Sequence, residues 1–175
     1  MDSQLRTALN NVMSTAPFAD KFQVPLHKEM VSILVFSLRS SENFGIPVAC
    51  IEEILPESKL HFIPGVPDYI LGVMIWHLEI IAVLDVERCL QFPARQSEHK
   101  RSRFLILRWD EMVFGLKVPM VVDVVSFPQD KILAMPPDTL NQAQKIFFQG
   151  YAKLDQKITT LLNLEMLVKK TIEEV

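Results

Sequence analysis

Short apolar runs separated by turn residues extend along most of the chain and predict many short β-strands. The polar stretches between them hold Pro, Gly, Ser, Asn and Asp, which favour turns because of their backbone preferences. Closing such apolar strands into small β-barrels removes exposed sheet edges, so the pattern favours barrels over an open sheet. The predicted strands cover residues 31–38, 44–54, 72–78, 79–84, 104–109, 112–118, 120–125, 132–135, 146–154 and 157–162.

Both ends of the chain have helical rather than strand-like patterns. In residues 1–27, apolar positions recur with helical spacing until Pro17 and Pro25, which predicts an N-terminal helical extension and linker. This extension either packs on its own domain or forms a detachable partner-binding arm. At the other end, Asn163 can cap a C-terminal helix that carries Glu165 in its first turn, where a negative charge is favourable.

A polar, basic stretch at residues 93–103 divides the strand-rich region into two halves of similar character. We expect a surface loop there, although its cations could also meet an acidic partner. The sequence predicts one domain over residues 28–175, with a first barrel at about residues 30–92 joined by the C-terminal helix. A second barrel is expected at about residues 102–162.

The chain has 175 residues, of which 49% are apolar and 22% charged, as is ordinary for a globular protein. Its net charge of −3 disfavours nucleic acid as a partner, since duplex binding needs clustered Lys and Arg. The longest apolar stretch, residues 70–84, is interrupted and shorter than the roughly 20 residues of a membrane span. With no apolar leader at the N-terminus, we expect a soluble cytoplasmic protein that does not insert into membranes. Cys50 and Cys89 are expected to be buried free thiols.

Residues that could form a catalytic or metal site are scattered. The five glycines are isolated, and the four histidines have no second His or Cys at ligand spacing. Glu52 and Glu53 are adjacent, so on a strand their side chains point to opposite faces and form no acid/base pair. The sequence therefore predicts a binding protein with no enzymatic activity, no cofactor and no metal. A small β-barrel enzyme or ligand-binding protein is the alternative from another class, and it would need polar groups that converge in a pocket.

Residues 70–86 resemble the CheW family, the adaptor proteins of bacterial chemosensory arrays. That family carries Pro-x-x-(Ile/Leu)-x-Gly and then a pattern like Gly-Val-x-Asn-Leu-Arg-Gly-x-x-x-Pro-x-x-Asp-Leu. The frame is kept by Pro67, Ile70, Gly72, Val73, Asp85 and Val86. Further matches, in order over about residues 30–172, are Phe44-Gly45-Ile46, Ile51-Glu52-Glu53-Ile54, Ile63-Pro64, Val121-Val122-Asp123, Gly150 with Asp155, and Leu162-Asn163-Leu164-Glu165.

The resemblance implies two intertwined five-stranded β-barrels without catalytic activity. Such proteins connect the cytoplasmic tips of methyl-accepting chemoreceptors to the regulatory domain of a CheA-type histidine kinase. A receptor helix would pack into an apolar groove between the barrels, as amphipathic helices do elsewhere. By motif matching, the receptor-binding residues are Val48, Ile51, Glu53, Ile54, Val122 and Val125. Gly72 and His77 match the segment associated with kinase binding, and any of these positions could instead belong to the core.

This chain departs from the family pattern at His77-Leu78, where the family has Arg-Gly. The resemblance implies that this arginine pairs with the glutamate matching Glu53, so we expect a Glu53–His77 pair in its place. Imidazole carries a charge that depends on pH, whereas guanidinium is always charged. His77 could equally be a tolerated substitution. The alternative function is a divergent CheW-like scaffold of pili motility or phototaxis that binds kinase without a standard receptor. The other departures are Ile75, Ala82 and Val124.

Overall fold

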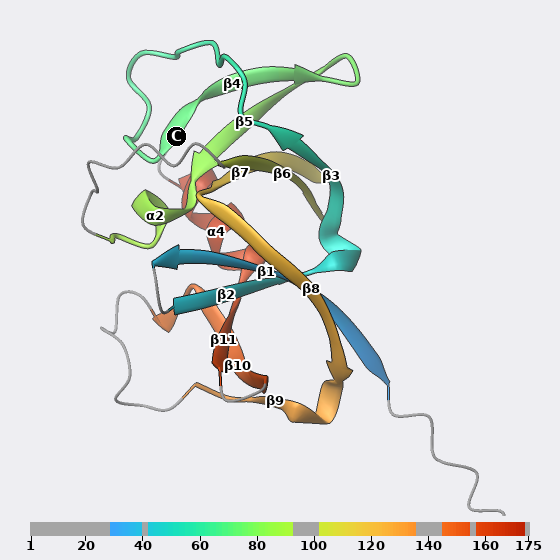
Figure 1. Ribbon diagram of the computed structural model, residues 1–175. Helices are drawn as coiled ribbons and strands as arrows, with labels where there is room; N and C mark the ends of the chain where they lie inside the picture. Colours follow the sequence, from blue (N-terminus) through green and yellow to red (C-terminus); the bar gives the residue numbers. More distant parts are fainter. Residues whose placement is uncertain (1–28, 40–41, 93–101, 136–144, 155–156, 174–175) are drawn as a thin grey trace, which may run out of the picture.

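The computed structural model describes residues 29–39, 42–92, 102–135, 145–154 and 157–173, which form two mixed β-sheets and four short or medium helices (Figure 1). The first sheet has the spatial order β8-β1-β2-β11-β10-β9, with β1 (Met30–Arg39), β2 (Glu42–Pro47), β8 (Met120–Pro128), β9 (Ile132–Leu133), β10 (Phe148–Leu154) and β11 (Lys157–Leu162). The second sheet has the order β3-β6-β7-β5-β4, with β3 (Ile51–Pro56), β4 (Ile70–Trp76), β5 (Glu79–Asp85), β6 (Arg103–Trp109) and β7 (Met112–Val118). The helices are η1 (Val48–Cys50), α2 (Val86–Cys89), η2 (Gln129–Lys131) and α4 (Leu164–Glu173).

Consecutive predicted strands pair as antiparallel hairpins in the structure, namely β4–β5, β6–β7 and β10–β11. The run predicted as one strand over residues 44–54 is instead interrupted. Pro47 ends β2, η1 follows, and the chain continues as β3 in the other sheet. Proline has no backbone N–H to donate to a strand ladder, which accounts for a strand end at this position.

Strands from both halves of the sequence share each sheet, which differs from the expected division into residues 30–92 and 102–162. The first sheet joins residues 30–47 to residues 120–162, and the second holds residues 51–118. The chain passes between sheets at η1 and again between β7 and β8, and the parallel pair β2–β11 joins the two segments of the first sheet on either side of the second. The two sheets are therefore intertwined.

The backbone pairings do not close either sheet into the expected barrel within the described residues. They leave β8 and β9 as the edges of the first sheet and β3 and β4 as the edges of the second. Pro119 precedes β8, and a proline beside a strand suits such an edge position because it has no N–H to donate. The predicted helical extension at residues 1–27 lies outside the described residues.

A shared core lies between the two sheets and includes buried side chains of α2 and α4. Its aromatic centre is Phe44, whose ring centroid is 6.1 Å from that of Phe36 and 5.9 Å from that of Phe148. Each sheet also buries a smaller cluster of its own. These clusters are Ile33, Val35, Phe127, Ala152 and Leu161 in the first sheet, and Trp76, Ile81, Val83, Phe104 and Ile106 in the second.

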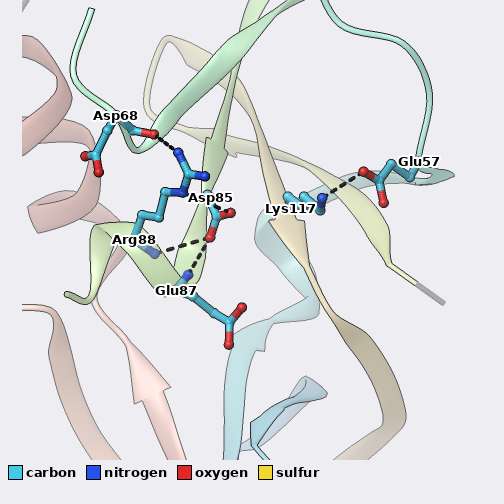
Figure 2. A network of polar contacts seen from close by, with 6 residues as sticks. All are labelled: Glu57, Asp68, Asp85, Glu87, Arg88 and Lys117. Atoms are coloured by element: carbon cyan, nitrogen blue, oxygen red, sulfur yellow. Dashed lines mark hydrogen bonds and ion pairs between the residues drawn. The ribbon is translucent and has the colours of Figure 1, made fainter. Parts of the chain in front are cut away.

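Side chains cap the N-termini of α2 and α4, and the cap at Asn163 was predicted. Asn163 Oδ1 accepts a hydrogen bond from the Met166 N–H at 3.3 Å and begins α4. Asp85 Oδ1 accepts from the N–H groups of Glu87 (2.9 Å) and Arg88 (3.2 Å), which begins α2 (Figure 2). No helix of the described residues is long and apolar enough to cross a membrane.

The Arg88 side chain fixes the loop that leads into β4. Its Nη1 donates to the backbone carbonyl of Asp68 at 2.7 Å, and Figure 2 shows the guanidinium extending from α2 toward that loop. At the right of Figure 2, Lys117 Nζ on β7 lies 2.7 Å from Oε1 of Glu57, the residue that follows the end of β3. The first contact attaches the loop before β4 to α2, and the second attaches the segment after β3 to the central strand β7.

Candidate functional site

A side-chain hydrogen bond joins the two edges of the second sheet. Trp76 Nε1, at the end of β4, donates to Glu53 Oε2 on β3 at 2.7 Å. These strands lie at opposite ends of the sheet order, so the contact brings together edges that the backbone leaves unpaired. The Trp76 side chain is 9% exposed and belongs to the small cluster of this sheet. A buried indole normally needs a hydrogen-bond partner, and Glu53 supplies it.

The turn after Trp76 has an unusual backbone for its residues. Trp76 pairs with Glu79, so His77 and Leu78 form a two-residue turn, with φ of 47° and 70°. Two positive φ values are typical of a type I′ turn, for which Asn-Gly is favoured. A leucine in this conformation is rare because its Cβ crowds the backbone. The Leu78 side chain is also 97% exposed, so the folded chain gains almost nothing by burying it.

His77 lies close to Glu53, as the sequence indicated, but it is not the main partner of this carboxylate. The distance from His77 Nε2 to Glu53 Oε2 is 3.8 Å, and the side chains are 73% and 42% exposed. An exposed pair at this separation contributes about 0–1 kcal/mol. The His77 ring instead stacks on Trp76, with centroids 4.3 Å apart and an interplanar angle of 23°. The sequence interpretation missed Trp76, although it occupies the family's leucine position beside the altered Arg-Gly.

The predicted receptor-binding residues before and on β3 differ in accessibility. Val48 and Ile51 are half-buried and pack against the shared core. Ile54 is 44% exposed, although it pairs with Leu105, whose side chain is in that core. Cross-strand neighbours share a sheet face. Ile54 therefore lies at the margin of the shared core, where a partner can reach it.

Strand β8 presents a similar margin on the first sheet. Val122 is exposed, whereas Val125 is half-buried against the small cluster of that sheet. Val124, which the sequence interpretation noted only as a departure from the family pattern, is 54% exposed. It pairs with Leu34 on the face of the shared core. Ile54 and Val124 thus occupy the margins of both sheets on their core-facing sides, and we call this pair the intersheet margin.

Gly72 is buried and serves the backbone. Its φ is 144°, and a Cβ there would lie 2.5 Å from the carbonyl oxygen of His61. The absence of a side chain lets His61 form a two-way backbone bridge with Val73, through bonds of 2.8 and 2.9 Å. Of the two positions matched to kinase binding, only His77 therefore presents a side chain to solvent; the kinase assignment of both stays a prediction.

Groups that could support chemistry are dispersed over the described residues. In this part of the chain, no three His, Cys, Asp or Glu side chains cluster so as to hold a metal ion. Cys50 and Cys89 are free thiols, as predicted, but only Cys89 is fully buried. Partial burial raises the pKa of the Cys50 thiol, which keeps it in the less reactive protonated form.

A small ligand could enter a cleft of about 850 Å³ between α2 and α4. It is lined by Pro67, Asp68, Tyr69, Arg88, Gln91, Phe92 and Lys170. Two of its polar groups already have partners within the fold. Lys170 Nζ lies 4.8 Å from the Tyr69 ring centroid, and Arg88 bonds the Asp68 carbonyl. Arg88 and Lys170 are thus engaged within the fold, and Asp68 and Gln91 are further polar residues that line the cleft.

Comparison with known proteins agrees with this architecture. The family profile of the CheW-like domain matches residues 32–171. The chain is 23% identical over 145 residues to the chemotaxis protein CheW of Helicobacter pylori, covering 82% of this chain and 85% of the relative. It is 25% identical over 136 residues to the chemotaxis protein CheW of Klebsiella aerogenes, covering 77% and 80%. The crystal structure of the scaffolding protein TtCheW from Thermoanaerobacter tengcongensis superposes with a TM-score of 0.71 at 27% identity, over 82% of this chain and 90% of that one. Since the family match spans most of the sequence, the chain belongs to the CheW-like domain family.

Proposed function

We propose that this chain is a non-catalytic adaptor that couples chemoreceptors to a CheA-type histidine kinase in chemosensory signalling. The observation that carries the proposal is the CheW-like match over residues 32–171, together with two intertwined sheets that resemble a known scaffolding protein. An adaptor needs surfaces rather than a reaction centre, and it would act in the cytoplasm, at membrane-associated receptor arrays.

The receptor tip would dock on the intersheet margin and the neighbouring part of β8. Ile54 and Val124 are apolar and exposed on the core-facing sides of the two sheets, and Val122 adds a third exposed apolar side chain. These are the kind of contacts that the apolar stripe of a helix makes in a groove. Val48, Ile51 and Val125 are half-buried, so they would support the groove from below more than line it.

The kinase regulatory domain would contact the β4–β5 hairpin. Figure 1 shows this hairpin projecting from the body of the second sheet. Its tip carries His77 and the fully exposed Leu78, and Ile75 and Ile80 are exposed opposite each other on its two strands. Gly72 would contribute by holding the base of the hairpin, because it is buried.

Calorimetric titration of the purified chain tests this function. The probes are the kinase regulatory domain and a helical-hairpin fragment of the receptor tip, both taken from the same genome. We expect both to bind. Ile54→Asp and Val124→Asp should each weaken receptor binding more than tenfold, since each places a charge in an apolar contact. Kinase binding should be unchanged.

Ile158→Asp is the matched control, because Ile158 is similarly exposed but lies on β11 of the first sheet. It should bind both probes like the wild type. If neither probe binds the wild-type chain, the adaptor function is contradicted.

A second candidate function is a scaffold of a divergent pathway, such as pili motility or phototaxis, that binds kinase without a standard receptor. His77-Leu78 in place of the family's Arg-Gly favours it, because the change lies beside Glu53. The same titration separates the two functions. Binding of the kinase domain without binding of the receptor fragment supports the divergent scaffold.

A further inference from the structure

Glu53 is held by one neutral donor and keeps one carboxylate oxygen available. The two contacts of this side chain within the described residues, the Trp76 hydrogen bond and the longer approach of His77, both involve Oε2. Within the described part of the chain, Oε1 has no hydrogen-bond or ion-pair partner. The side chain is 42% exposed, so a group from outside can reach it.

An arginine in place of His77, as in the family pattern, would leave the Glu53 carboxylate in a different state of charge and hydrogen bonding. A guanidinium is permanently charged and can bond both oxygens of a carboxylate through its planar fork. An indole has a single N–H and no charge, so it fixes one oxygen without neutralising the group. Trp76 can do this because its ring is anchored in the small cluster of the second sheet, which leaves its N–H pointing at the β3 edge.

The hairpin that meets Glu53 carries a second carboxylate. Glu79 is the cross-strand neighbour of Trp76, so its exposed side chain lies on the same face of the hairpin. His77 is the basic side chain in contact range of Glu53 among the described residues, and its Nε2 stays 3.8 Å from Oε2, beyond hydrogen-bond distance. A carboxylate in this setting would attract a positive side chain from a partner.

We propose that Trp76 is a positioning residue that orients the Glu53 carboxylate to accept an Arg or Lys side chain of the docking receptor helix. The inference rests on the proposed adaptor function and names the chemistry of its partner at this point. In this chain the positive charge is supplied by the partner, whereas the family pattern supplies it from within the adaptor.

The test separates the indole N–H from the indole ring. Benzothienylalanine at position 76 keeps the shape of tryptophan but has no N–H, and Trp76→Phe is a second variant for the same question. Trp109→Phe is the matched control, because Trp109 also ends a strand of the second sheet before a two-residue turn. Glu53→Gln keeps an acceptor for Trp76 and removes the charge.

The first readout uses the free protein and needs no partner. The two tryptophans give two indole N–H resonances in a proton–nitrogen NMR spectrum, which Trp76→Phe and Trp109→Phe assign. We expect Glu53→Gln to move the Trp76 resonance and to leave that of Trp109 in place. An unmoved Trp76 resonance would overturn the inference.

The second readout is the affinity for the receptor-tip fragment at low and high salt. We expect Glu53→Gln to weaken binding about tenfold and to remove much of the salt dependence, because a charge-assisted contact is lost. Benzothienylalanine should weaken binding about threefold to tenfold while the salt dependence stays. Replacing the receptor's Arg and Lys residues one at a time should identify one whose effect is not additive with Glu53→Gln.

The two failures are distinguishable. If the wild-type chain binds, Glu53→Gln weakens binding and benzothienylalanine has no effect, Trp76 does not position Glu53, and the inference is overturned while the adaptor function stands. If the wild-type chain binds neither the receptor fragment nor the kinase domain, the adaptor function itself is overturned, and the inference with it.

Discussion

The second sheet contains two hairpins of the same length that obey local rules to different degrees. In both, a tryptophan ends the first strand and two residues make the turn. The turn of β6–β7 holds Asp110 and Glu111, both exposed, with φ of 53° at Asp110. Aspartate tolerates this conformation better than most residues, so the turn follows ordinary preferences.

The β4–β5 hairpin breaks those preferences. Its turn has positive φ at both His77 and Leu78, and Leu78 is 97% exposed. Neither burial nor turn propensity favours a leucine there. Backbone strain and exposed apolar side chains that local structure does not explain are typical of functional sites. The β6–β7 turn thus follows local rules, whereas the β4–β5 turn departs from them, and the proposed contact between this hairpin and the kinase would account for the departure.

Replacing the tryptophans of the two hairpins should give the largest difference in the free energy of unfolding. Trp76 fills the small cluster of the second sheet and bonds Glu53, whereas Trp109 is half-buried at the margin of the shared core. Trp76→Ala should lower the free energy of unfolding by about 3–5 kcal/mol, and Trp109→Ala by about 1–3 kcal/mol. Urea unfolding followed by circular dichroism measures both. Equal losses would remove the distinction between the hairpins.

Replacing the glycines of the two hairpins should give a smaller difference in the free energy of unfolding. Gly72 has a φ of 144°, and an added Cβ there would lie 2.5 Å from the backbone oxygen of His61. Since the clash is with backbone rather than with a side chain, it cannot be relieved by a rotamer change. At Gly115 an added Cβ would meet Val83 Cγ2 at 2.9 Å, the end of a side chain. Gly72→Ala should therefore destabilise the protein by about 2–4 kcal/mol and Gly115→Ala by about 1 kcal/mol. Urea unfolding curves measure both losses. A larger loss for Gly115→Ala than for Gly72→Ala would contradict the role given to Gly72.

The turn residues should give the smallest effect, with opposite signs for stability and binding. Leu78→Gly should stabilise the fold by about 0.5–1 kcal/mol, because glycine accepts a positive φ without strain. Asp110→Gly should change stability by less than about 0.5 kcal/mol. If the hairpin tip contacts the kinase, Leu78→Gly should also weaken kinase binding in calorimetry, while Asp110→Gly should not. A Leu78→Gly protein that is more stable and binds the kinase domain equally well would make Leu78 a tolerated irregularity.

Local features were predictable from the sequence. The hairpins were visible as paired apolar runs, and the Asp85 and Asn163 caps follow from side chains that bond backbone groups two or three residues ahead. Sheet membership was not predictable in this way. Pro47 was not interpreted as the point where the chain changes sheet, and the parallel pairs β2–β11 and β5–β7 join strands far apart in the sequence.

The candidate site was predictable only in part. The family resemblance placed Glu53 beside His77, which the structure confirms as a 3.8 Å approach. It gave no reason to examine Trp76, because a tryptophan in a strand looks like an ordinary core residue until the position of its N–H is known. Likewise, Val124 followed an apolar run, and only the pairing of β8 with β1 reveals that it is exposed at the intersheet margin.

Chemical-shift mapping with the receptor-tip fragment and the kinase regulatory domain, each titrated into the isotope-labelled chain, tests the central claim most directly. The receptor fragment should perturb β3, β8 and the Trp76 indole, and the kinase domain should perturb the β4–β5 hairpin, while β10 and β11 stay unchanged. Perturbations centred on the cleft between α2 and α4, or none with either protein, would contradict the adaptor surfaces assigned to this chain.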